Sequence, residues 1–404
     1  MERSSCFDSD SKSDDDANKN ENLELLLPED LKIQIFTLVP LTYLINSVRY
    51  VCKPWAAIIA GPRFAEACQR FDIRFKPGLY VENRKSKSSS YFLEFKDDVN
   101  GQFERIDLGT PKKMGHVIGT CDGILLLLNT ARQVFAVNPF LKCWLRIPPF
   151  PFSRHNQGFP CQCTITRVPR TAKFKLFHAD ILEISGAYSC VFYVLRIGID
   201  SSWKEIARKE AFPMFRRLYF SSRPLYSGGN DLYWITYNEV ILMDIDKETI
   251  VGEYPVPFIT MDPYERSITM YSSVPFEMFL HMGERLSRIV SIDSHRTYQI
   301  YILDFDSENW SLYHEMGPFD YMSASGHNLK PRSASFRLWI NDQIIFQVGL
   351  HKTETGSMSS RKSIHFGYNV KTKQLTKIED IEVGDFDVWL HTISLVSLPT
   401  TLHS

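Results

Sequence analysis

Hydrophobic and polar positions follow two patterns along this chain, and the change between them falls near residue 77. Apolar residues recur with helical spacing between residues 27 and 75. From residue 91 onward, short runs of Val, Ile, Leu, Phe and Tyr alternate with turns rich in Gly, Pro, Asn and Asp. The chain is therefore expected to be an α+β protein in which a small helical domain precedes an all-β domain.

The first predicted helix carries two apolar stripes. One stripe contains Leu31, Ile35 and Leu38, and the other contains Ile33 and Phe36. Pro40 ends this helix, and two more helices are expected over residues 40–48 and 51–60. Three short helices in about 38 residues bury too little surface to be stable alone. One apolar stripe of the first helix is enough for packing against the other two helices. The second stripe therefore predicts a partner protein.

This region resembles the F-box, through Leu27-Pro28, the apolar positions of the first helix, and Val-Cys-Lys-Pro-Trp at 51–55. The segment 44–55 is one residue longer than the usual pattern, and Asn46-Ser47 stand where apolar and basic residues are common. The resemblance implies docking onto a Skp-type adaptor and, through it, onto a cullin and a RING protein. The residues expected to contact the adaptor are Leu27, Pro28, Leu31, Ile35, Phe36, Pro40, Leu44, Val51, Cys52 and Trp55.

The β region repeats a unit in which a strand, an Asn or Asp turn and a strand with a large apolar residue follow one another. The large residues, spaced by 41 to 65 positions, are Phe103, Trp144, Trp203, Ile250, Trp310 and Leu375. Such a repeat predicts a β-propeller, with six blades favoured. A seventh blade remains possible in the irregular stretches 150–172 or 256–285. The last strand, Val388 to Ser397, is expected to complete the first blade and close the ring.

The β region also resembles the kelch-like, propeller-like domain of plant F-box proteins. The segments that carry this resemblance are 119–125, Asn138-Pro139-Phe140 with Trp144, 231–234 and 391–396. With the F-box, the likeness spans about residues 27–398. It implies a substrate-recognition subunit of a Skp–cullin–F-box ubiquitin ligase, which catalyses nothing itself and needs no cofactor. A non-degradative binding role is the alternative, and a propeller enzyme such as a hydrolase is a more remote one.

Composition and charge add few restrictions. Residues 1–22 are acidic and Ser-rich and are expected to be disordered, followed by a helical domain over 23–76 and a propeller over 77–398. The net charge of −1 gives no general attraction to nucleic acid or membranes. Eight cysteines, none in the last 214 residues, indicate free thiols rather than a disulfide framework. With no secretory signal or membrane span in the pattern, a cytoplasmic or nuclear location is expected.

No spacing in the chain fits a catalytic or metal-binding motif. His155, Cys161, Cys163 and His178 do not follow zinc-ligand spacing. Basic residues around 167–175 and 216–223 are more typical of scattered solvated charge than of a binding face. Trp234, Trp339 and Trp389 are expected to be core residues.

Four long irregular stretches, 148–172, 209–229, 256–285 and 314–336, are rich in aromatic residues, Met and Arg, which are typical of binding surfaces. We expect these stretches to gather on one propeller face and bind the target. The alternative is that their aromatic residues pack over the blades. The residues expected to bind the target are Phe215, Arg216, Tyr219, Tyr264, Tyr271, Phe319 and Tyr321.

Overall fold

The computed structural model divides the chain into two compact units, Met1–Arg74 and Phe75–Ser404. The structure describes residues 27–40, 43–44, 47–70, 77–83, 90–95, 103–106, 114–151, 162–184, 186–211, 220, 222–226, 228–236, 238–257, 279–283, 285–292, 296–326, 330–351, 362–381, 383–384, 386–396 and 398. The predicted disordered tail, residues 1–22, lies outside these ranges.

The first unit is helical. Its elements are α2 (Glu29–Thr37), the 3₁₀ helix η1 (Val48–Tyr50), α4 (Lys53–Ala60) and α5 (Pro62–Arg70). Two acidic residues in the first turn of α2 suit the positive end of the helix dipole, and Arg63 of α5 binds both, at 3.1 Å from Glu29 and 2.5 Å from Asp30. Among the described residues, no helix is long and apolar enough to cross a membrane.

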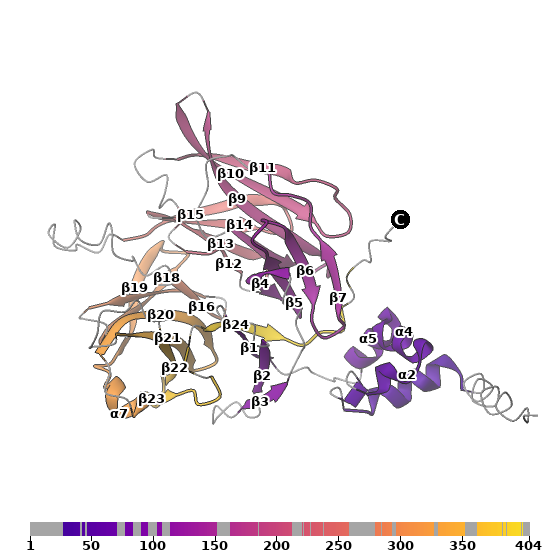
Figure 1. Cartoon of the computed structure of the whole chain (residues 1–404). Helices are drawn as coiled ribbons and strands as arrows, with labels where there is room; N and C mark the ends of the chain where they lie inside the picture. Colours follow the sequence, from indigo (N-terminus) through magenta and orange to yellow (C-terminus); the bar gives the residue numbers. More distant parts are fainter. Residues whose placement is uncertain are drawn as a thin grey trace, which may run out of the picture. The chain divides into compact units, whose positions relative to one another are not determined.

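The second unit is a propeller of six four-stranded antiparallel sheets (Figure 1). Blade 1 contains β24 (Phe386–Thr392), β1 (Pro77–Asn83), β2 (Tyr91–Phe95) and β3 (Phe103–Ile106). Blade 2 contains β4 (His116–Cys121), β5 (Ile124–Leu128), β6 (Val134–Asn138) and β7 (Cys143–Arg146). Blade 3 contains β8 (Cys163–Arg167), β9 (Phe174–Ile184), β10 (Ala187–Arg196) and β11 (Lys204–Ala211).

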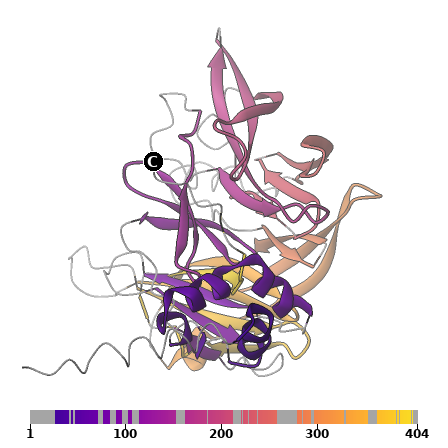
Figure 2. The ribbon, with the colours of Figure 1, turned by 90° about the vertical axis from the view of Figure 1, so that its right-hand side faces the viewer.

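The remaining blades have the same order. Blade 4 contains β12 (Leu225–Tyr226), β13 (Asp231–Ile235), β14 (Glu239–Asp244) and β15 (Thr249–Pro255). Blade 5 contains β16 (Phe279–Met282), β17 (Arg285–Ser291), β18 (Tyr298–Asp304) and β19 (Asn309–Met316). Blade 6 contains β20 (Lys330–Ile340), β21 (Gln343–His351), β22 (Lys362–Asn369) and β23 (Gln374–Lys377). Figure 2 shows the long β9–β10 hairpin of blade 3 extending beyond its neighbours.

The first strands of successive blades, β4, β8, β12, β16, β20 and β24, contact one another around the ring and are its innermost strands. Because β24 pairs with β1 along its full length, the C-terminal strand closes the ring, as predicted. The prediction of six blades is confirmed within the described residues. The stretches proposed for a seventh blade contain instead β8 and β16, the innermost strands of blades 3 and 5.

The repeating turn seen in the sequence joins the third and outermost strands of four blades. Each turn starts with an Asn or Asp whose side-chain oxygen accepts backbone N–H groups two or three residues later: Asn138, Asp244, Asp304 and Asn369. The fifth residue of each turn has a positive φ, of 54°, 59°, 57° and 57° at Lys142, Glu248, Glu308 and Lys373. This local chemistry makes the outer hairpins visible in the sequence.

The large apolar markers also connect neighbouring blades. The indole N–H of Trp203, next to β11, donates to the Pro148 carbonyl beyond β7, at 3.1 Å. The indole N–H of Trp310 donates to the Pro255 carbonyl at the end of β15, at 2.9 Å. A marker Trp therefore fixes the end of the preceding blade's outermost strand, besides filling the space between blades.

The described residues beyond β24, 393–396 and 398, form a C-terminal clasp that lies along blade 2. The Asn138 side-chain amide donates to the carbonyls of Ser394 and Val396, both at 2.9 Å. Gly123 has φ +82°, and a Cβ at this position would lie 2.2 Å from the Ser394 Cβ. Ile393, Leu395 and Leu398 are buried. Three of the segments that resemble the plant domain, 119–125, 138–140 and 391–396, therefore meet at the ring closure.

Asn138→Asp is expected to lower the free energy of unfolding by about 2–4 kcal/mol, because it keeps the turn-capping oxygen but turns a buried acceptor toward the carbonyl oxygens of Ser394 and Val396. Asn369→Asp is the matched control, since Asp is the natural residue in two of the four turns. That change should cost less than about 0.5 kcal/mol. Urea unfolding of both variants measures the difference, and equal losses would refute a specific role for the Asn138 amide in the clasp.

Candidate functional site

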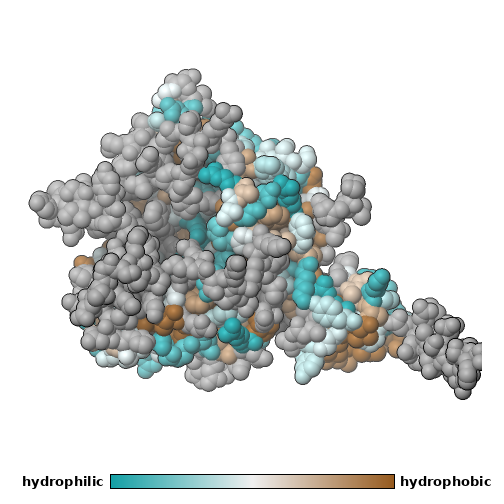
Figure 3. Space-filling model, viewed as in Figure 1, coloured by the Kyte–Doolittle hydropathy of each residue, from teal (hydrophilic) through white to brown (hydrophobic). Residues whose placement is uncertain are grey.

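Helix α2 has one buried apolar face and one exposed apolar face. Ile33 and Phe36 are 6 % and 3 % exposed. On the other side of the helix, Leu31 and Ile35 are 45 % and 47 % exposed, and Leu38 is 84 % exposed. Leu27, just before α2, is 43 % exposed. These four residues, Leu27, Leu31, Ile35 and Leu38, are called the α2 stripe, and Figure 3 shows apolar residues gathered on the helical unit.

The buried face of α2 packs on α4 and α5. The Phe36 ring lies 5.0 Å from the Trp55 ring and 6.4 Å from the Phe64 ring, edge-on in both cases. Phe64, Ile59 and Cys68 are also buried. Because Ile33 and Phe36 face this core, the α2 stripe on the opposite side remains exposed.

The structure corrects part of the predicted adaptor surface. Phe36 was expected to be exposed but is core, because it lies one helical turn after Ile33 and shares its inward face. Leu44 is buried as well, and Cys52 and Trp55 are half-buried. Pro28, Pro40 and Val51 are exposed, in addition to Leu27, Leu31 and Ile35.

Two exposed tyrosines of the helical unit were not predicted. Tyr43 and Tyr50 are 64 % and 59 % exposed. They are seven residues apart, the spacing of two helical turns, but they were not included in the predicted adaptor surface. Leu38 could have been included, since it follows Leu31 by two turns.

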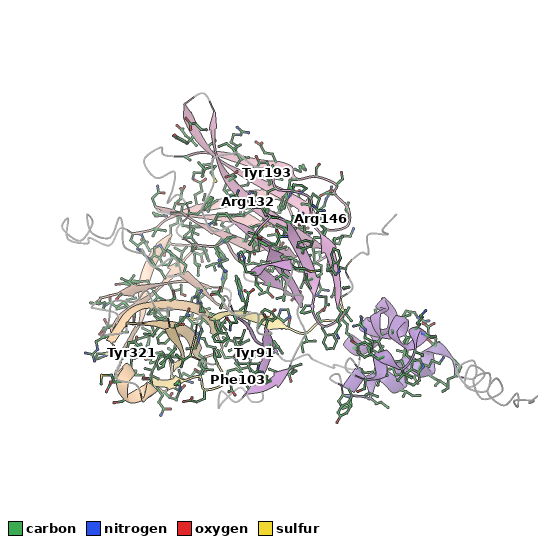
Figure 4. The ribbon with its side chains drawn as sticks, in the orientation of Figure 1. Tyr91, Phe103, Arg132, Arg146, Tyr193 and Tyr321 are labelled. Carbon is green, nitrogen blue, oxygen red and sulfur yellow. The ribbon has the colours of Figure 1, made fainter. Side chains whose placement is uncertain are left out.

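The structure also corrects two of the predicted target-binding residues. Phe319 and Tyr321 are 6 % and 5 % exposed. The short helix α7 (Tyr321–Ser325) begins after Asp320, whose carboxylate accepts two of its N–H groups. Tyr321, labelled in Figure 4, packs onto Phe366 of blade 6, with 5.4 Å between ring centres. The aromatic residues of this stretch therefore pack between blades, which was the alternative interpretation. Phe215, Arg216, Tyr219, Tyr264 and Tyr271 lie outside the described residues.

The strand order puts both ends of every link between blades on one face of the ring. In each blade, successive antiparallel strands run from the innermost position to the outermost position. The chain then returns to the innermost strand of the next blade. All links between blades consequently start and end on the same face. Each of the four stretches contains one such link. We call this side the linker face.

A contact between opposite blades crosses the ring axis. The Arg223 guanidinium, just before β12 of blade 4, lies 4.6 Å from the Trp389 ring centre in β24 of blade 1. Blades 1 and 4 are opposite each other in the ring. Trp389 is accordingly half-buried, and its assignment to the core was wrong, whereas the burial of Trp234 and Trp339 is confirmed.

The candidate zinc ligands that the structure describes are packing residues. Cys163 and His178 are opposite each other on β8 and β9, and both are buried. The His178 ring packs against Phe150 and Trp203, at 4.5 and 5.8 Å between centres. His155 and Cys161 are not among the described residues. Within the described ranges, no group of three or more His, Cys, Asp or Glu residues could hold a metal ion.

The basic residues around 167–175 are mostly paired with carboxylates of other blades. Arg167 lies 3.1 Å from Asp122 of blade 2. Lys175 lies 2.7 Å from Glu248 of blade 4. These pairs agree with structural rather than partner-binding roles for both cations.

Comparison with known proteins identifies no family for this chain. No family model matches it, and no curated protein matches it. Among solved structures, oligogalacturonate lyase from Vibrio parahaemolyticus is 10 % identical, with a TM-score of 0.41 over 75 % of this chain and 74 % of the lyase. The β-propeller domain of the Trilobed protease from Pyrococcus furiosus is 12 % identical, with a TM-score of 0.31 over 75 % and 72 %. The fold assignment rests on the strand order of the chain itself.

Three buried histidines predict loss of propeller stability in acid. Burial lowers the pKa of His178 to about 4 and the pKa values of His365 and His391 to about 3, with Arg337 contributing at His365. These side chains stay neutral in the folded protein but bind protons in the unfolded chain below about pH 6.5. Their contribution is therefore constant above pH 6.5 and is lost as the pH falls toward 4, by up to ~1.4 kcal/mol per pH unit for each histidine.

Urea unfolding between pH 7 and pH 4.5 measures this loss. His178→Phe keeps the aromatic contacts with Phe150 and Trp203 but cannot bind a proton, so its stability should fall less steeply with pH. Parallel pH profiles for the variant and the natural chain would rule out His178 as a source of the acid sensitivity.

Proposed function

We propose that this chain is the substrate-recognition subunit of a Skp–cullin–F-box ubiquitin ligase. The α2 stripe supports the proposal most strongly, because four apolar side chains in or next to α2 stay exposed while the opposite face of the helix already forms the core of the unit. They belong to the segment that resembles the F-box, and the resemblance implies a Skp-type adaptor as the partner that covers them.

The propeller supplies the second half of this role. Six blades form a ring closed by the C-terminal strand, and every link between blades starts and ends on its linker face. Loops on a rigid scaffold can vary without disturbing the blades, which suits them to target recognition. The chain then acts by proximity, since it raises the effective concentration of target lysines near the ubiquitin-conjugating partner.

Calorimetric titration of the full chain with a purified Skp-type adaptor tests the proposal. We expect saturable binding with one adaptor per chain and a negative heat-capacity change, because apolar surface is buried. Absence of binding by a chain whose propeller and helices are folded, as judged by circular dichroism, would overturn the proposal.

A further inference from the structure

The outermost strand of blade 5 has an open edge. Strand β19 ends its sheet, and no described strand pairs with its outer side. Leu312 and Tyr313, at the middle of β19, are 50 % and 49 % exposed. In Figure 1 the strand lies at the outer left margin of the propeller. Such an edge presents backbone N–H and C=O groups that another extended chain can pair with.

The other outermost strands are protected against pairing. Strands β3, β7 and β23 have only four residues each. Strand β11 is as long as β19, with eight residues, but it contains Lys204, Glu205, Arg208, Lys209 and Glu210. Strand β15 contains a Gly, a Glu and a terminal Pro. Strand β19, NWSLYHEM, has no Gly, Pro, Lys or Arg, and Glu315 is its one acidic residue.

A β-bulge interrupts the pairing of β19 with β18 at the middle of the strand, beside its exposed apolar residues. Leu312 is opposite Tyr301 and His314 is opposite Ile300, so Tyr313 is the extra residue. The Tyr313 ring lies 6.0 Å from the Trp339 ring of blade 6. The one carboxylate, on Glu315, accepts a hydrogen bond from the Gln299 amide of β18 at 2.5 Å. An incoming strand would therefore meet apolar side chains at its centre and little charge.

We infer that β19 binds an extended segment of a target protein as a fifth strand of blade 5, with apolar side chains at alternate positions of the segment. This inference rests on the proposed function in one respect only, which is that the bound segment is called part of a target protein. A second copy of the chain fits less well, because two-fold pairing of β19 with itself would set two bulges against each other at the centre of the ladder.

The experiment uses a phage-displayed library of ten-residue peptides, selected on the full chain, and one enriched peptide made synthetically with a fluorescent label. Fluorescence anisotropy then compares the natural chain with Leu312→Lys. The control variant is Val251→Lys, since Val251 is an equally exposed apolar residue on β15, the outermost strand of blade 4. Both changes are on the surface, and both variants should keep the melting temperature of the natural chain.

We expect enriched peptides with alternating apolar residues and no proline. Their affinity should fall at least tenfold with Leu312→Lys, stay unchanged with Val251→Lys, and disappear when alternate peptide nitrogens are methylated. Equal binding to all three chains, binding that survives methylation, or failure to enrich any peptide would overturn the inference. A dimer of the natural chain that is detected by light scattering and that Leu312→Lys dissociates would also overturn the inference. Adaptor titration of the same variants separates this test from the proposed function, because Leu312→Lys should leave adaptor affinity unchanged.

Discussion

A chain that ends at residue 385 should lose the cooperative unfolding transition of the propeller. The truncation removes β24, which is the innermost strand of blade 1 and contacts the innermost strands of blades 6 and 2. It removes Phe386 and Val388 from the core between blades 1 and 6. It also removes the buried Asp387 carboxylate, 3.3 Å from Arg337. Together these losses exceed the roughly 5–15 kcal/mol by which a protein of this kind is stable.

Differential scanning calorimetry of the truncated chain measures this effect. The matched control ends at residue 398, so it keeps β24 and the C-terminal clasp, and it should melt like the full chain. A sharp transition near the natural melting temperature in the 385-residue chain would mean that the ring does not need its closing strand.

Leu31→Asp combined with Ile35→Asp should weaken adaptor binding by about 100- to 1000-fold, or ~3–4 kcal/mol. Both side chains are nearly half-exposed on the α2 stripe, and each new carboxylate would have to be desolvated in an apolar interface. Since neither residue belongs to the core of the helical unit, the helices should stay folded. Calorimetric titration with the adaptor measures the loss.

Two controls give this measurement its specificity. Ile199→Asp combined with Val251→Asp makes the same chemical change at two exposed apolar positions of the propeller, and it should leave adaptor affinity unchanged. Phe36→Ala should instead destabilise the helical unit, by about 3–5 kcal/mol, through a cavity beside Trp55. Normal adaptor affinity in the Leu31/Ile35 double variant would show that the α2 stripe is not the docking surface.

The outer parts of the propeller could be predicted from the sequence because their signals are local. The residues Trp144, Ile250, Trp310 and Leu375 follow Asn or Asp turns whose hydrogen bonds span only two or three residues, and all four lie in outermost strands. These four residues, together with Phe103 and Trp203, were the six markers that predicted six blades.

Several inner strands could not be predicted, for a physical reason. Strands β4, β8, β12 and β16 each contact the innermost strands of both neighbouring blades, so their polar residues can be buried and do not mark a solvent-exposed face. Strand β12 has only two residues. In β8, Thr164 and Thr166 are buried, and these polar residues interrupt the apolar run that would otherwise indicate a strand.

The candidate site was predicted best where spacing was the guide. Helical spacing separates Leu31 and Ile35 from Ile33 and Phe36, and the structure exposes the first pair and buries the second. The family resemblance alone put Phe36 on the adaptor surface. For Phe319 and Tyr321, composition could not decide, because aromatic residues are favoured both in binding surfaces and between packed blades.

Reconstitution of the assembly tests the central claim most directly. The full chain is mixed with a Skp-type adaptor, a cullin and its RING protein, and the mixture is analysed by size-exclusion chromatography with light scattering. The account predicts one complex with a single copy of each protein, from which the Leu31/Ile35 double variant is excluded. Elution of the folded natural chain apart from an intact adaptor–cullin–RING complex would contradict it.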